Sequence, residues 1–311
     1  MNISEIPYWL LQIMLIPALS PFFIGVTCRI KAIMQNRRGA PVLQPYRDLR
    51  KLFQKDEVIS EDASWLFRAA PYLIFAVTLV IGASIPLVTT ALPNSYTGDF
   101  LVVVYLVALG TFFLALAGID SGSAFGGFGS SREMMVAALT EGGLVLSLLT
   151  LALISKTTNL AAISENIGSL PLTSFTPIIL AFISFSIALL AETCRYPFDN
   201  PATHLELTMI HEAMILEYSG KRLALMEWAS ANKYLIFIAL GANLFFPRGI
   251  AGSLEFVPVM LALALFAGKV LLFCLAIAII ESSIAKLRIF RLPDLLFTSF
   301  VISVIAIGLV N

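Results

Sequence analysis

Eight long apolar runs constrain this sequence more than any other feature. They lie at residues 7–28, 70–90, 100–118, 134–155, 173–191, 233–247, 257–280 and 294–310. A helix needs roughly 20 apolar residues to cross about 30 Å of hydrocarbon, and most of these runs are long enough. Only 13% of the residues are charged, against roughly 25% in a soluble domain, which excludes a soluble or disordered chain. We predict an all-α polytopic membrane protein, with residues 1–311 forming a single membrane domain.

The basic residues indicate how the predicted spans are oriented. Every Lys and Arg residue except Lys156, Arg248 and Lys269 falls in one of four alternate loops, at 29–69, 119–133, 192–233 and 281–293. Because basic residues collect in cytoplasmic loops, this pattern places those loops in the cytoplasm and both termini outside. The two long loops, at about 29–69 and 192–232, are then cytoplasmic. The first run lacks the basic stretch and cleavage site of a signal peptide, so it is predicted to be a retained span.

Several function classes are excluded or disfavoured. The three cysteines, Cys28, Cys194 and Cys274, form no CxxC pair, which gives no support to an iron–sulfur cluster or a zinc site in this chain. The net charge of +0 leaves no basic footprint for nucleic acid. The sequence shows no obvious internal repeat, which disfavours a secondary transporter built from inverted repeats.

An acid inside a predicted span is the first sign of function. Glu141 lies in the run 134–155, eight residues into a helix predicted to start near Glu133. A carboxylate inside the bilayer costs roughly 2.5–3.5 kcal/mol on insertion scales, so it must pair, face a wet cavity or hold its proton. Reversible proton uptake is one interpretation, and a protonated carboxyl that only bonds to a neighbouring helix is the other.

The segment 191–220 concentrates acids and both histidines. Pro197 and Pro201 interrupt any helix that continues from the fifth run, and from about residue 202 the spacing again predicts a helix. Steps of three and four residues place on one stripe His204, Thr208, His211 and Ile215. The acids and histidines here are Glu192, Asp199, His204, Glu206, His211, Glu212 and Glu217. They suit a proton relay at the inner edge of the membrane, and an amphipathic surface helix with solvated charges is the alternative.

Three further features carry weaker signals. Residues 37–53 combine a Gly/Pro turn with a basic amphipathic helix, which is either an anchor on anionic headgroups or a docking surface for a cytoplasmic partner. Residues 118–133 contain many glycines and are predicted to be a flexible cytoplasmic loop. Lys269, inside the seventh run, and Glu281, just below it, are candidate counter-charges to Glu141.

These motifs resemble a known family. The stretches NRRGAPVLQPYRDLRKLF at 36–53, AETCRYPFD at 191–199 and EYSG at 217–220 are similar to the membrane-anchor subunit shared by respiratory complex I and the group 4 energy-converting [NiFe] hydrogenases. The segments 118–133, 204–220 and 281–288 resemble the hydrogenase branch, represented by hydrogenase-4 component C and formate hydrogenlyase subunit 4.

The resemblance implies a cofactor-free membrane subunit that is not catalytic alone. It would anchor a peripheral arm whose large subunit holds NiFe and whose small subunit holds Fe–S clusters, beside antiporter-like membrane subunits in a prokaryotic cytoplasmic membrane. It would couple electron transfer to movement of H⁺ or Na⁺. The implied proton-transfer residues are Glu141, Glu192, Asp199, Glu206 and Glu217, and the possible relay residues are His204, His211, Glu212, Lys269 and Glu281. The implied interface with the peripheral arm comprises Arg37, Arg38, Arg47, Asp48, Arg50 and Arg195.

Two alternatives stay open. The first is subunit 1 of a quinone-reducing complex I, which would line the quinone cavity; Ala202 and His204 stand where that branch usually carries acids. The second is a stand-alone channel or transporter, which the acids in the spans permit.

Overall fold

A computed structural model describes residues 6–60, 63–91, 98–170, 175–200 and 208–310 of the chain. Over these residues the protein is helical, with two isolated β-bridges, Thr89 to Ala251 and Asp99 to Asn159. Eight helices within the described ranges are long and apolar enough to cross a membrane. The predicted all-α fold with eight spans is therefore confirmed.

The helices follow the predicted runs in order. The spans are α1 (Ile6–Met34), α3 (Trp65–Ser84), α4 (Phe100–Asp120), α5 (Ala124–Ser155), α7 (Phe175–Glu192), α9 (Gly220–Leu240) continued by the π-helical η3 (Gly241–Phe245), α10 (Phe256–Ser283), and the 3₁₀ turn η4 (Ile289–Arg291) continued by α11 (Leu292–Gly308). The shorter helices are α2 (Gln44–Gln54), α6 (Leu160–Gly168) and α8 (His211–Ile215).

The glycine-rich segment forms helix rather than the predicted flexible loop. α4 continues to Asp120 and α5 already begins at Ala124, after Ser123, whose hydroxyl accepts a hydrogen bond from the Gly126 amide at 3.1 Å. The glycines allow close packing: a Cβ on Gly126 would lie 2.2 Å from the Gly118 carbonyl oxygen. The start near residue 133 was therefore wrong, and Glu141 lies seventeen residues into α5, not eight.

The sixth span is longer than its apolar run. α9 starts at Gly220 instead of residue 233, because Asn232 and Lys233 are bonded to side chains of other helices and do not end the span. The long loop predicted to reach residue 232 thus ends at Ser219. α3 stops at Ser84, before the predicted end at residue 90, since Ile85 precedes a proline and is biased away from helix.

The helix predicted from about residue 202 is only partly present. Within the described residues it begins at His211, and Thr208 lies in a turn, so the stripe of Thr208, His211 and Ile215 does not form on one helix. His204 and Glu206 lie outside the described residues.

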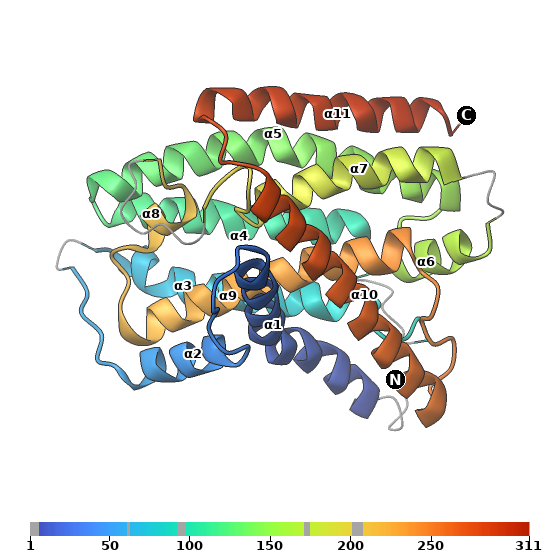
Figure 1. Cartoon of the computed structure of the whole chain (residues 1–311), viewed down its shortest axis with the longest axis horizontal. Coiled ribbons are helices and arrows are strands. Elements are labelled where there is room, and N and C mark those ends of the chain that lie inside the picture. Colours follow the sequence, from blue (N-terminus) through green and yellow to red (C-terminus); the bar gives the residue numbers. More distant parts are fainter. Residues whose placement is uncertain (1–5, 61–62, 92–97, 171–174, 201–207, 311) are drawn as a thin grey trace.

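The ends of the molecule differ in the connections they carry. Figure 1 shows that the α1–α3, α4–α5, α7–α9 and α10–α11 connections lie towards its left-hand end, which we call the basic end. α1 begins and α11 finishes towards the right-hand end (Figure 1). The loops that hold most Lys and Arg residues thus share one end of the bundle.

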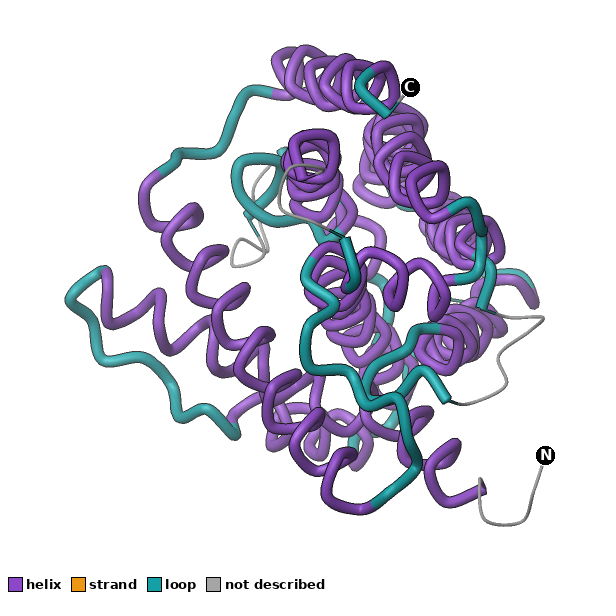
Figure 2. Tube along the Cα trace, turned by 90° about the vertical axis from the view of Figure 1, so that its right-hand side faces the viewer, coloured by secondary structure: helices purple, strands orange, loops and turns teal. Residues whose placement is uncertain are grey.

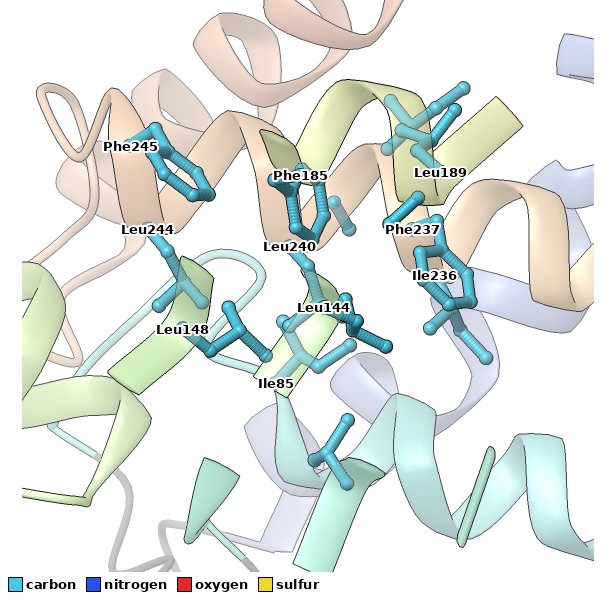
Figure 3. Close-up of a cluster of buried hydrophobic side chains, with 14 of the residues drawn as sticks. Ile85, Leu144, Leu148, Phe185, Leu189, Ile236, Phe237, Leu240, Leu244 and Phe245 are labelled. Carbon is cyan, nitrogen blue, oxygen red and sulfur yellow. The ribbon is translucent and has the colours of Figure 1, made fainter. Parts of the chain in front are cut away.

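α9 occupies the middle of the bundle. In the most apolar 18-residue stretch of its span, 67% of the residues are buried. The same fraction is 28% for α10 and for the span that contains α11. Figure 2 shows α10 and α11 on the periphery. Figure 3 shows the apolar core, where side chains of α5 and α7 meet α9 and η3 around Phe185, Phe237 and Leu240. This packing fixes the α7 and α9 backbones, which carry the charged residues described next.

Candidate functional site

A charged cavity of about 430 Å³ opens at the basic end. It lies between the end of α1, the chain that follows α7, α8 and the start of α9. Its charged or titratable lining residues are Cys28, Lys31, Arg37, Arg38, Cys194, Arg195, Asp199, His211, Glu212, Glu227 and Glu281. Seven residues predicted from the sequence thereby meet in one place, namely Arg37, Arg38, Arg195, Asp199, His211, Glu212 and Glu281.

Glu281 holds two cations in the wall of this cavity. Its carboxylate lies 3.2 Å from Arg195 Nη1 and 3.1 Å from Lys31 Nζ. The contact with Lys31 is an ion pair without hydrogen-bond geometry, since Glu281 Oε2 has no hydrogen-bond partner within the described part of the chain. The Arg195 guanidinium also lies over the Tyr234 ring, 4.5 Å from its centroid. Arg195, proposed from the sequence for a partner interface, is 7% exposed and belongs to this internal cluster.

The predicted pairing of Glu141 with Lys269 and Glu281 is wrong. Glu281 is occupied by Lys31 and Arg195, and Lys269 Nζ donates to Asn243 Oδ1 at 3.3 Å. The Glu281 contacts join α10 to α1 and to the chain after α7, which are far apart in the sequence, whereas Lys269 bonds to η3, the element directly before α10.

Asp199 fixes the start of α8. Its carboxylate accepts hydrogen bonds from the amides of Ile210 at 3.0 Å and His211 at 3.3 Å. Lys286 Nζ reaches the same carboxylate at 2.8 Å and donates to the Thr208 carbonyl at 3.1 Å. Asp199 is 2% exposed, so it ties the chain after α7 to α8 and to the α10–α11 connection from the interior.

Glu192 and Lys233 form a buried ion pair deeper in the bundle. The Lys233 Nζ lies 2.7 Å from Glu192 Oε2 and 3.3 Å from Thr111 Oγ1. Glu133 is buried nearby, and its Oε2 accepts a hydrogen bond from Cys194 Sγ at 3.8 Å. Neither Lys233 nor Glu133 was predicted from the sequence to be functional. Had the helix been predicted to start at Ala124, Glu133 would have stood out as an acid within a span, as Glu141 did.

Three cavities follow one another from the basic end towards Glu141. A small cavity of about 60 Å³ shares Cys194 and His211 with the charged cavity, and Glu192 and Lys233 also line it. A third cavity of about 230 Å³, between α4 and α5, shares Glu192 with the small one and is lined by Glu141. Glu141 therefore faces a cavity that contains a second carboxylate.

Two side chains between the first two cavities are held neutral. Burial is the main cause that lowers the pKa of His211 to about 4; the Lys233 charge lowers it further and Asp199 opposes the shift. Burial, followed by the charge of Glu133, raises the pKa of the Cys194 thiol well above its usual value. At physiological pH both groups keep their neutral forms.

The remaining predicted residues lie on the surface. Arg47, Asp48 and Arg50 lie on α2, which Tyr46 ties to α1 by a hydrogen bond to the Ala18 carbonyl. Glu217 is exposed just after α8, outside all three cavities. Among the described residues, no group of three or more His, Cys, Asp or Glu side chains is placed to hold a metal.

Comparison with known proteins decides the family. The model of the NADH dehydrogenase family, which includes subunit 1 of complex I, matches residues 7–311. This chain belongs to that family. It is 35% identical to hydrogenase-4 component C of Escherichia coli (strain K12), over 96% of this chain and 93% of the relative. It is 33% identical to formate hydrogenlyase subunit 4 of the same organism, over 94% of each chain.

A more distant relative matches less of the chain, and a solved structure shows the same fold. A subunit of the NADH-quinone oxidoreductase of Syntrophotalea carbinolica is 31% identical over 73% of this chain and 71% of its own length. A chain in a solved structure, that of the membrane-bound sulfane sulfur reductase, an archaeal respiratory membrane complex, superposes with a TM-score of 0.86. It covers 99% of this chain and all of the other at 21% identity, which shows the shared fold. The resemblance seen in the sequence is confirmed, and the chain is a multi-pass membrane protein of this family.

Proposed function

We propose that this chain is the membrane anchor of a hydrogenase-type complex related to complex I, in a prokaryotic cytoplasmic membrane. The two E. coli relatives, a hydrogenase component and a formate hydrogenlyase subunit, align over nearly the whole chain, whereas the quinone oxidoreductase relative aligns over about three quarters. NiFe and Fe–S groups would be held by partner subunits of the peripheral arm and not by this chain.

In this proposal the chain couples electron transfer to ion movement. The observation that carries the proposal is the series of cavities that runs from the basic end past Glu192 to Glu141. Carboxyls that line neighbouring cavities can take up and release protons in turn, whereas the apolar interior of a bilayer offers no group that can do so. Asp199, Glu192 and Glu141 form the described part of the route. Glu206, which lies outside the described residues, and the exposed Glu217 stay predictions.

We further propose that the basic end docks the peripheral arm. Arg37 and Arg38 line the charged cavity, and α2, which packs against α1 and α9, presents Arg47, Asp48 and Arg50 on the surface. An arm seated there would cover the cavity, so that its redox step occurs next to Glu281 and Arg195. Antiporter-like membrane subunits would adjoin the spans.

The test is a conservative replacement in the assembled complex. Glu141→Gln keeps the size of the side chain and removes the exchangeable proton, so we expect ion uptake per turnover in inverted membrane vesicles to fall at least tenfold. Glu165→Gln, an exposed acid on α6, is the matched control and should behave as wild type. Wild-type ion uptake in Glu141→Gln would refute the coupling role. Quinone bound to the purified complex would instead favour a quinone-reducing complex.

A further inference from the structure

Glu133 is a buried carboxyl that, among the described residues, has no cation at ion-pair distance. It is 4% exposed, and its described hydrogen-bond partner is the Cys194 thiol. Each of the other buried carboxyls in the described residues contacts at least one cation: Glu192 contacts Lys233, Asp199 contacts Lys286, and Glu281 contacts Lys31 and Arg195. A buried carboxylate with only a weak thiol donor is poorly stabilised. This arrangement suits a carboxyl that alternates between two protonation states better than one with a purely structural role.

Through its contact with Cys194, Glu133 adjoins a residue that two of the cavities share. Cys194, which contacts it, lines both the charged cavity and the small cavity behind it. The charged groups close enough to act on the Glu133 carboxyl are Lys233 on α9, Glu192 at the end of α7 and Asp199 before α8. Lys233 forms an ion pair with Glu192 and also acts electrostatically on Glu133, so one ammonium group interacts with two carboxyls.

The neighbouring titratable side chains, Cys194 and His211, are not suited to exchanging protons near neutral pH. Burial holds the pKa of the Cys194 thiol well above its usual value and is the main cause that lowers the pKa of His211 to about 4. Neither group therefore changes its charge near neutral pH. Of the three side chains Cys194, His211 and Glu133, the Glu133 carboxyl is the one whose chemistry permits reversible proton transfer.

We propose that Glu133 is a proton-carrying residue that exchanges protons with Glu192, while Lys233 follows the negative charge. This inference rests on the function proposed above. In the forward step the O–H bond of Glu133 breaks and an O–H bond forms on the Glu192 carboxylate. The Lys233 ammonium then leaves the neutral Glu192 and pairs with the Glu133 carboxylate. The total charge of the three groups is unchanged, so the step adds no net charge to the interior, and the flexible lysine stem allows the movement.

The experiment compares replacements at Glu133 in the assembled complex in inverted membrane vesicles. Glu133→Gln removes the exchangeable proton at constant size, and we expect ion uptake per turnover to fall at least tenfold. Glu133→Asp keeps a carboxyl, so we expect it to retain uptake with a shifted pH profile, which a merely structural role would not produce. Glu165→Gln again serves as the control for an acid outside the route.

The outcomes separate this inference from the proposed function. If Glu141→Gln abolishes uptake and Glu133→Gln does not, Glu133 is no carrier, although the coupling role stands. If both variants pump like wild type, the proposed function itself fails. Should Glu133→Gln not assemble, Glu133→Met supplies an apolar side chain of similar length. Wild-type uptake in assembled Glu133→Met, or an unshifted pH profile in Glu133→Asp, would overturn the inference.

Discussion

Replacing Lys233 by methionine tests how the buried ion pair of α9 contributes to stability. Lys233→Met leaves the Glu192 carboxylate buried without the cation that contacts it at 2.7 Å. Breaking a buried pair on one side costs about 3–5 kcal/mol. The Lys233 side chain is 23% exposed and that of Glu192 only 6%. Water can therefore hydrate the unpaired Glu192 carboxylate only slightly. We expect the free energy of unfolding to fall by about 3 kcal/mol.

The double variant Lys233→Met with Glu192→Met separates stability from ion transport. Replacing a buried pair by apolar side chains of similar volume is often neutral, so the double variant should unfold within about 1 kcal/mol of wild type, as a double-mutant cycle would record. Unfolding is measured by circular dichroism of the detergent-purified subunit as SDS is raised. Ion uptake by the complex should stay lost, because the Glu192 carboxyl is absent. A loss below about 1 kcal/mol in Lys233→Met alone would refute the reasoning.

Three further predictions concern α8 and its contacts. Gly129→Val places a Cβ about 2.8 Å from that of Ala213, and such overpacking should destabilise the subunit by about 1–3 kcal/mol in the same SDS titration. Asp199→Ala removes the acceptor of the Ile210 and His211 amides and should cost about 1–3 kcal/mol, seen as faster proteolysis near α8; unchanged cleavage would contradict it. The folded pKa of His211, about 4, lies below its ordinary 6.5, so the unfolded state binds the proton first and stability falls as pH drops between these values. His211→Gln should lose less stability over that interval than wild type.

The spans were predictable because their signal is local. Eight apolar runs and the alternation of basic loops follow from residues that are neighbours in the sequence, and the structure contains all eight helices. The errors came where a span contains residues typical of loops. Gly118 and Gly129 pack against α8 within helices instead of lying in a loop, and Lys233 is neutralised by a partner 41 residues away.

The charge pairing of the site was not predictable from one sequence. Asp199, Glu192 and Glu281 stood out because acids are rare in this chain, and the structure does place two of them in one cavity. Their partners come from distant parts of the chain: Lys286 in the α10–α11 connection for Asp199, and Lys31 on α1 for Glu281. Such pairs depend on the packing of the bundle, which periodicity and propensity do not determine.

The central position of α9 has a mechanical consequence. Two consecutive residues of this helix serve different clusters, since Lys233 contacts Glu192 and Tyr234 lies under Arg195. Rotation of α9 about its axis would disturb the Lys233–Glu192 and Tyr234–Arg195 contacts together. The close-packed apolar core around α9 resists such a rotation. The scaffold therefore acts as a fixed frame, in which lysine and carboxyl side chains, rather than whole helices, supply the movement.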